Sequence, residues 1–208
     1  AAAMAAPVNT GASSESDTVR AWRAFSEQLE EAGVAVLQSY PQPQAIDRAE
    51  ALPFLLQQLS TAINRAMIEQ PGQPPLLRVD ASTINKWALD GADVKYLIAP
   101  IDPARRYRLR GRVGEARLFA MQAVRMAAPY GAFASLTGDE LTTGADNSFE
   151  VLLSASRPDD WHGAWLQIDP DADYLLLREY FADWESEEPG HYELHDLAVP
   201  QPGLMTLE

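Results

Sequence analysis

The sequence predicts an α+β protein in which two N-terminal amphipathic helices precede an antiparallel β-sandwich or partial barrel. Apolar residues recur at helical spacing in the first third of the chain, whereas short apolar segments of strand character fill the remainder. Turn-forming residues such as Asp102-Pro103 and Thr143-Gly144 separate those later segments. Because helices do not alternate with strands, the pattern favours an antiparallel architecture over βαβ units.

The first predicted helix covers residues 18–39, with Asp17 or Thr18 as its N-cap. The second covers about residues 46–69, and Pro53 inside it predicts a kink or a restart, because proline lacks the N–H that an interior helical position donates. The predicted strands are 94–101, 106–113, 116–124, 148–156, 164–168, 174–184 and 191–199.

These elements divide the chain into four parts. We expect a flexible arm over 1–17, a helical subdomain over 18–89 that ends with a short helix at 79–87, a sandwich domain over 90–200 and a tail over 201–208. The arm has neither the basic segment nor the apolar segment of a secretory signal, so a cytoplasmic location is expected.

Composition excludes several classes of function. The chain has 208 residues, 30 acidic against 16 basic side chains, a net charge of −14 and no cysteine. The excess of acid argues against nucleic acid and anionic membranes as partners. The lack of cysteine excludes disulfides, thiolate metal sites and cysteine nucleophiles, and no motif predicts a cofactor or a metal.

The charge is unevenly distributed. Residues 76–125 carry ten basic and five acidic side chains, whereas residues 126–208 carry two and seventeen. Within the basic part, arginine alternates with other residues over 106–113, so a strand there would present a row of arginines on one face. The row comprises Arg106, Arg108, Arg110 and Arg112.

Such a row has two interpretations. It is a face of cross-strand ion pairs or a solvated surface, with acids of the tail standing opposite. Alternatively it is a wall that binds a carboxylate, phosphate or sulfate, because arginine grips these groups with two parallel hydrogen bonds. The candidate acids of the tail are Glu179, Asp183, Glu185, Glu187 and Glu188.

A second group of candidate residues lies in and after the strand at 174–184. Arg178 interrupts an apolar run, and a charge there needs a partner or a wet cavity. It is either a structural arginine or, together with Tyr180, part of a pocket mouth that holds an anionic or hydroxylated ligand. Asp183 and Trp184 follow and complete the set.

Two runs of sequence resemble those of domain-of-unknown-function family 1214 of bacterial proteins. The first extends from Trp87-Ala-Leu-Asp-Gly91 through Ala99-Pro-Ile-Asp102 to Tyr107-Arg-Leu-Arg-Gly111, and the second is Arg178-Glu-Tyr-Phe-Ala-Asp-Trp184 with Pro189. The resemblance covers roughly residues 18–198 and implies a sandwich or jelly-roll-like region, but it implies no reaction. Pro53 departs from the family pattern, and many relatives are longer than this chain.

Two further patterns are weaker. His191, Glu193 and His195 would share a strand face, but their spacing matches no standard metal motif, so we expect polar surface residues there. Asp169, Asp171 and Asp173 imitate the start of a calcium loop without its glycine, so we expect a turn with acidic caps.

Three hypotheses of function remain. The leading one is a non-catalytic sandwich module that binds a small molecule or a partner chain. The second is a hydrolase or lyase that uses Asp93 or Asp183 with Tyr180 and arginine support. The third is a subunit of a homo- or hetero-oligomer whose basic middle contacts an acidic end. Whether the protein is an enzyme stays open at this point.

Overall fold

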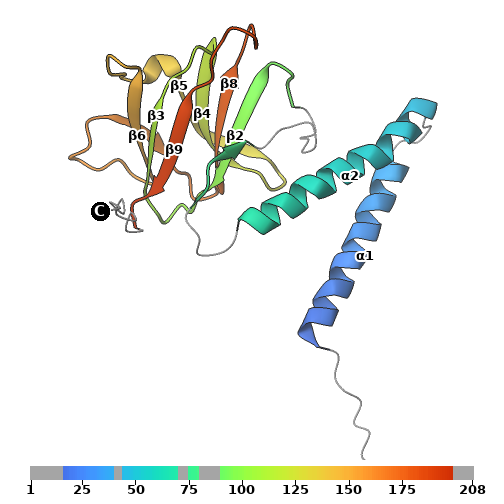
Figure 1. The fold of residues 1–208 in the computed structure, drawn as a ribbon. Helices are drawn as coiled ribbons and strands as arrows, with labels where there is room; N and C mark the ends of the chain where they lie inside the picture. Colours follow the sequence, from blue (N-terminus) through green and yellow to red (C-terminus); the bar gives the residue numbers. More distant parts are fainter. Residues whose placement is uncertain (1–15, 40–43, 70–74, 80–89, 199–208) are drawn as a thin grey trace, which may run out of the picture. The chain divides into compact units, whose positions relative to one another are not determined.

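The computed structural model describes residues 16–39, 44–69, 75–79 and 90–198, and it has two helices followed by two β-sheets (Figure 1). This is the α+β, sandwich-like arrangement that the sequence predicts. The elements are α1 (Asp17–Gln38), α2 (Ala45–Ile68), β1 (Arg78–Val79), β2 (Val94–Pro100), β3 (Tyr107–Arg112), β4 (Leu118–Arg125), β5 (Gly131–Thr137), the 3-10 helix η1 (Gly138–Glu140), β6 (Ser148–Ser154), β7 (Ala164–Gln167), β8 (Tyr174–Tyr180) and β9 (His191–Asp196).

The chain forms two compact units, Ala1–Leu56 and Gln57–Glu208. The first contains α1 and the beginning of α2, and the second contains the end of α2 and both sheets. Residues 1–15 of the arm expected over 1–17, most of the short helix expected at 79–87, and the tail over 201–208 lie outside the described residues. Ser16 and Asp17 of the expected arm are the N-cap and the first residue of α1, and Val79 ends β1.

Both helices form where the apolar spacing predicts them. The N-cap of α1 is Ser16, one residue before the predicted position, and its hydroxyl accepts a hydrogen bond from the Val19 amide at 3.4 Å. Asp17 in the first turn adds a favourable interaction with the helix dipole. Pro53 lies within α2, which continues through it from residue 45 to 68, so the helix does not restart there.

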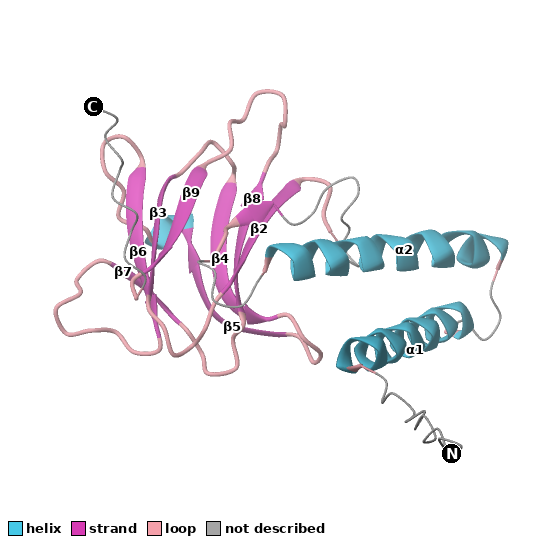
Figure 2. Cartoon of the chain, turned by 60° about the horizontal axis from the view of Figure 1, so that its bottom comes forward, coloured by secondary structure: helices cyan, strands magenta, loops and turns pink. Residues whose placement is uncertain are grey.

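The sheets have the strand orders β1-β2-β8-β4-β5 and β7-β6-β3-β9. Neighbouring strands are antiparallel except for β6 and β7, which are parallel and lie side by side in Figure 2. All seven predicted strands are present with ends that shift by a few residues. The sequence analysis missed β5, whose small residues are all exposed or only partly buried and so give no clear alternation.

The core lies between the two sheets. The inward side chains of both sheets form one apolar cluster, and many of them are fully buried, which stabilises each by about 1.5–3 kcal/mol relative to exposure. Members from the first sheet include Leu97, Phe119, Met121, Leu175 and Leu177; members from the second include Leu109, Phe149, Val151, Leu153 and Tyr192.

The first sheet also buries apolar side chains on its other face. Tyr96, Val124 and Leu176 form a second cluster there, and Ile98 beside them is fully buried. The two sheets therefore differ, because the outward face of the second sheet is polar.

None of the described helices is long and apolar enough to cross a bilayer.

Candidate functional site

Three arginines project outward from β3, a central strand of the second sheet. Arg108, Arg110 and Arg112 alternate with Tyr107, Leu109 and Gly111, which face the core. The period of two in this segment therefore produces the predicted row of arginines. Arg106 precedes the strand and is not part of the row; its carbonyl accepts a hydrogen bond from the Leu197 amide.

The strands on both sides of β3 bring charged and polar residues into register with this row. Arg110 lies between Glu150 of β6 and Glu193 of β9, while Arg108 and Arg112 each pair with a histidine of β9. We call this surface the arginine face; it comprises Arg108, Arg110, Arg112, Ser148, Glu150, His191, Glu193 and His195.

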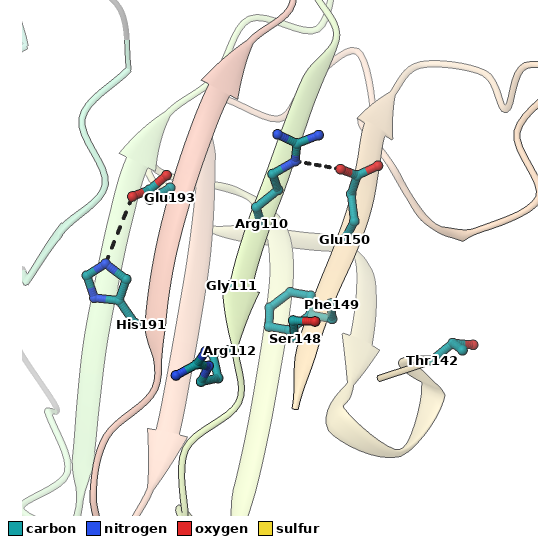
Figure 3. A pocket seen from close by; sticks show the side chains of 9 residues that line it. All are labelled: Arg110, Gly111, Arg112, Thr142, Ser148, Phe149, Glu150, His191 and Glu193. Carbon is teal, nitrogen blue, oxygen red and sulfur yellow. Dashed lines mark hydrogen bonds and ion pairs between the residues drawn. The ribbon is translucent and has the colours of Figure 1, made fainter. Parts of the chain in front are cut away.

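The acids opposite the arginines are not those that the sequence analysis proposed. Glu150 accepts a hydrogen bond from Arg110 Nε at 2.6 Å (Figure 3). The other carboxylate oxygen of Glu150 lies 3.5 Å from Arg108 Nε. The Arg112 guanidinium lies 3.5 Å from a carboxylate oxygen of Asp146. The proposed partners fail because β3 pairs with β6 and β9, whereas the run from Glu179 to Glu188 lies in and after β8 of the other sheet.

An open pocket of about 750 Å³ lies over this face. Its lining residues are Arg110, Gly111, Arg112, Thr142, Ser148, Phe149, Glu150, His191 and Glu193, drawn in Figure 3. Within the described part of the chain, the hydrogen bonding of Arg110 uses only Nε, so both terminal nitrogens of its guanidinium remain for a ligand. The side chains of Arg110 and Arg112 are 55% and 66% exposed.

An aromatic side chain bounds the same face beyond the pocket. The Arg108 guanidinium lies 5.8 Å from the centre of the Trp161 ring, within the range of a cation–π contact. The loop that carries Trp161 is fixed by Arg157, which donates hydrogen bonds to the carbonyls of Trp161 and Gly163. The indole N–H of Trp161 donates to the Ala164 carbonyl, so the ring has a defined position.

The two histidines of β9 lie on either side of Glu193, as their spacing predicts. The Glu193 carboxylate is 3.3 Å from His195 Nε2 and 4.0 Å from His191 Nε2. Among the described residues, no three histidine, aspartate or glutamate side chains are placed so that they could hold a metal ion together. The face therefore carries three permanent cations, two strand carboxylates and two imidazoles.

Arg178 and Tyr180 lie elsewhere, on the outward face of β8 in the first sheet. Arg178 is half-buried and donates a hydrogen bond to the side-chain carbonyl of Gln122 on β4. Neither residue lines the pocket of the arginine face. The structure thus brings Arg108 and Arg110 together, but it separates them from Arg178 and Tyr180.

Asp183 and Trp184 form a turn after β8. The Asp183 carboxylate accepts hydrogen bonds from the Ser186 hydroxyl and the Glu185 amide, which hold the pKa of Asp183 below its ordinary value. Trp184 stacks on Phe181 with ring centres 4.1 Å apart. Both oxygens of the Asp183 carboxylate are thus used by hydrogen bonds within the turn.

The aspartates of the calcium-like pattern form a turn with acidic caps, as expected. Asp169 accepts a hydrogen bond from the Asp171 amide, Asp173 accepts one from the Met126 amide, and Asp171 pairs with Arg125. Each carboxylate therefore supports the local backbone or an ion pair.

The sequence analysis proposed Glu179 only as a partner of the arginine row and did not predict its burial. Glu179 is fully buried between the sheets, where its Oε1 atom accepts hydrogen bonds from the Gly190 amide at 2.6 Å and the Tyr192 hydroxyl at 2.8 Å. Lys95 Nζ lies 3.6 Å from the other carboxylate oxygen. Burial and the neighbouring carboxylate raise the pKa of Tyr192 above its ordinary value. The alternation of Leu175, Leu177 and Glu179 along one strand face was the sequence signal that could have predicted this burial.

A second, smaller pocket of about 290 Å³ lies at the turn between β3 and β4 and includes Arg117 and Asp139 in its lining. Arg117 pairs with Glu187 at 2.8 Å, so this acid of the tail pairs with an arginine outside the row. That contact lies away from the row on β3.

The comparisons with known proteins give the fold alone. No family model and no curated protein matches the chain. An uncharacterised protein from Burkholderia cenocepacia has a solved structure with a TM-score of 0.77 and 21% identity over 89% of this chain and 52% of that one. A Vibrio parahaemolyticus protein gives a TM-score of 0.38 and 13% identity over 90% of this chain and 47% of that one. The chain spans about half the length of both proteins.

Proposed function

We propose that the protein is a binding module whose arginine face holds a small anionic ligand, such as a carboxylate or phosphate compound. The observation that carries this proposal is the row of arginines on β3, which opens to solvent in a chain of net charge −14. Acids outnumber bases almost twofold in this chain, so three neighbouring guanidinium groups on one sheet face need a physical reason.

The ion pairs of the face leave capacity for a ligand. Glu150 lies near the Nε atoms of both Arg108 and Arg110, so one carboxylate serves two cations. A ligand oxyanion would accept from the terminal nitrogens of Arg110 and from Arg112, while the Ser148 hydroxyl and the imidazole of His191 supply further polar contacts. A pocket of about 750 Å³ accommodates a ligand larger than the anion itself.

Acidic side chains near the arginine row restrict where an anionic ligand can bind. Glu193 lies in register with Arg110 and would repel a ligand that extended across β9. The β6 side also carries acids, because Glu150 pairs with Arg110 and Asp146 lies 3.5 Å from Arg112. A compact oxyanion would therefore bind above β3, at the terminal nitrogens of the two arginines. The remainder of the ligand would lie over the backbone at Gly111.

Isothermal titration calorimetry of the full chain with citrate and with inorganic phosphate tests this proposal. We expect binding that weakens with added salt, and a loss of at least about tenfold in affinity for Arg110→Gln and for Arg112→Gln, because a hydrogen bond to a charged group contributes about 1.5–3 kcal/mol. Arg117→Gln at the second pocket removes the same charge elsewhere and is the matched control.

Two outcomes would contradict the proposal. One is the absence of binding by both anions at millimolar concentration. The other is binding that Arg117→Gln abolishes and the two variants of the arginine face leave unchanged, since the ligand would then occupy the second pocket.

We also propose that the chain belongs to family 1214 and that its strands connect in a jelly-roll-like order. The run Tyr107-Arg-Leu-Arg-Gly111 that supports the resemblance is β3 itself, so two arginines of the proposed site lie within the family motif. The remainder of that motif supports the fold, because the Asp102 amide donates a hydrogen bond to the Tyr107 hydroxyl at 2.8 Å.

A further inference from the structure

Among the described strands, three of the four sheet edges are protected against pairing with another chain. The edge strand β1 has two residues and β7 has four, and β5 is bulged at Phe133, where its register with β4 shifts. Short strands and bulges are common means of keeping an exposed sheet edge from pairing. The fourth edge is β9, which has six residues, no proline and an unbroken register with β3.

The backbone of β9 has hydrogen-bonding groups that β3 does not use. The Leu197 amide donates to the Arg106 carbonyl, so the hydrogen-bonded pairs with β3 fall on the odd-numbered residues of β9. The N–H and C=O groups of Tyr192, Leu194 and Asp196 therefore point away from β3. Within the described part of the chain, β9 pairs with no strand other than β3, so these groups form a free edge.

The outward side chains of β9 are self-complementary in an antiparallel pair. One carboxylate, that of Glu193, lies between the imidazoles of His191 and His195, and Figure 3 shows Glu193 beside His191. When two copies of β9 pair through their free edges with Leu194 opposite Leu194, each Glu193 lies opposite His195 of the other copy. An imidazole N–H donates to a carboxylate, so this contact is favourable, and it occurs twice about the twofold axis.

The neighbouring registers are less favourable. With Tyr192 opposite Leu194, Glu193 would lie opposite Glu193, and like charges directly across a sheet are destabilising. With Tyr192 opposite Tyr192, Glu193 would lie opposite His191, but the ladder would need the Gly190 amide, which already donates to Glu179 at 2.6 Å. One register therefore uses the whole free edge without a conflict.

We propose that the protein forms a homodimer in which β9 pairs antiparallel with β9 of a second copy, in the register that places Glu193 opposite His195. The second sheet then continues through the interface as one sheet of eight strands, twice the four of a single copy. The twofold axis is perpendicular to this sheet, so the arginine faces of both copies lie on the same side. The pairing is independent of any ligand of that face.

Analytical ultracentrifugation of the full chain over a concentration series tests the proposal. A salt concentration of about 150 mM screens the repulsion between two chains of net charge −14. We expect a dimer for the native chain, and for Glu193→Lys a dissociation constant raised at least about tenfold. The reason is that an ammonium group cannot accept from the imidazole opposite, and the change occurs twice in the interface.

Two further variants separate the contact from the charge. Adding His195→Glu to Glu193→Lys returns an opposite charge to the facing position and should restore the dimer. Glu185→Lys makes the same charge change in the exposed turn after β8, away from β9, and should leave the dimer intact. Circular dichroism of each variant establishes that the helices and sheets still form.

Single cysteines report the register, because the native chain has none. An equimolar mixture of Glu193→Cys and His195→Cys chains should form a disulfide-linked dimer under mild oxidation, since the two positions lie opposite each other. Either variant alone should form much less, because equal positions are then offset along the strands. Non-reducing gel electrophoresis measures the linked fraction.

Three results would overturn the proposal. A native chain that stays monomeric at about millimolar concentration shows that a second copy does not pair with this edge. A dimer that Glu193→Lys leaves unchanged, in a variant with native circular dichroism, forms through another surface. Disulfide formation that is as efficient in each cysteine variant alone as in the mixture excludes the register.

Discussion

The helices and the sandwich use apolar residues in opposite ways. Between the sheets, side chains such as Met121 and Leu153 are fully buried, and the cluster continues through both sheets. On the helices, large apolar side chains such as Trp22 and Leu56 are more than half exposed. The difference indicates that the sandwich satisfies its own hydrophobic surface, whereas the helices need a further surface to cover theirs.

The sharpest test of the sandwich is its buried carboxylate. Glu179→Ala leaves the Gly190 amide and the Tyr192 hydroxyl without their acceptor and leaves Lys95 without its partner, so we expect a loss of about 4 kcal/mol in the free energy of unfolding. Urea denaturation measures this. Glu150→Ala removes an acid whose side chain is 33% exposed and should cost about 1 kcal/mol or less. Equal losses of unfolding free energy in the two variants would show that the burial of Glu179 does not increase its contribution to stability.

A paired truncation compares the two regions directly. Leu176 is fully buried in the second cluster, so Leu176→Ala should lower the free energy of unfolding by about 3 kcal/mol. Trp22→Ala removes a side chain that is 67% exposed and should cost under about 1 kcal/mol. Urea denaturation measures both, and losses of similar size at the two positions would contradict the contrast.

A glycine at the centre of the sandwich provides a smaller effect. A Cβ atom at Gly111 would lie 2.6 Å from the His191 carbonyl oxygen and 2.7 Å from the Tyr192 ring. Gly111→Ala should therefore cost about 2 kcal/mol in thermal or urea unfolding. Gly138→Ala is the control, because its nearest neighbour would lie 3.7 Å away. A neutral result at both positions would mean that β3 and β9 separate easily.

The dependence of stability on alkaline pH gives the smallest effect. The pKa of Tyr192 is raised in the folded state, so above its ordinary value of 10.0 the unfolded chain loses a proton that the folded chain retains. Stability from this group is fully present below pH 10 and falls as the pH rises further. Urea midpoints from pH 8 to 11.5 should show the decline, and Tyr192→Phe should reduce its slope. A slope that is unchanged in this variant would assign the decline to other groups.

Much of the fold follows from local patterns. The alternation in 106–113 predicts both the strand and the outward arginines, and the 3.6-residue spacing predicts both helices. β5 could not be predicted because Gly131 to Thr137 is an edge strand with little buried surface, so its alternation is weak. The parallel pairing of β6 and β7 depends on the path of a loop, which local preference does not encode.

The candidate site was predictable only in part. Period-two alternation places Arg108 and Arg110 together, but the acids opposite them depend on which strands flank β3. Glu150 and Glu193 lie about 40 and 80 residues away in sequence, and no local signal links them to β3. The neighbours Arg178 and Glu179 show the same limit, since burial of one and partial exposure of the other depends on which sheet face meets the core.

The parallel pair β6 and β7 has a consequence for the surroundings of the arginine face. To enter β7 in the same direction as β6, the chain from Ala155 to Gly163 must travel back along the sheet, about 13 Å for a four-residue strand. Nine residues reach about 30 Å at most, so the return path uses nearly half of the loop's extent. The rest of the loop is long enough to place the Trp161 ring 5.8 Å from the Arg108 guanidinium. The length of this loop thus determines the position of the Trp161 ring. Insertions or deletions in the loop would move the ring relative to Arg108 without changing any residue of β3.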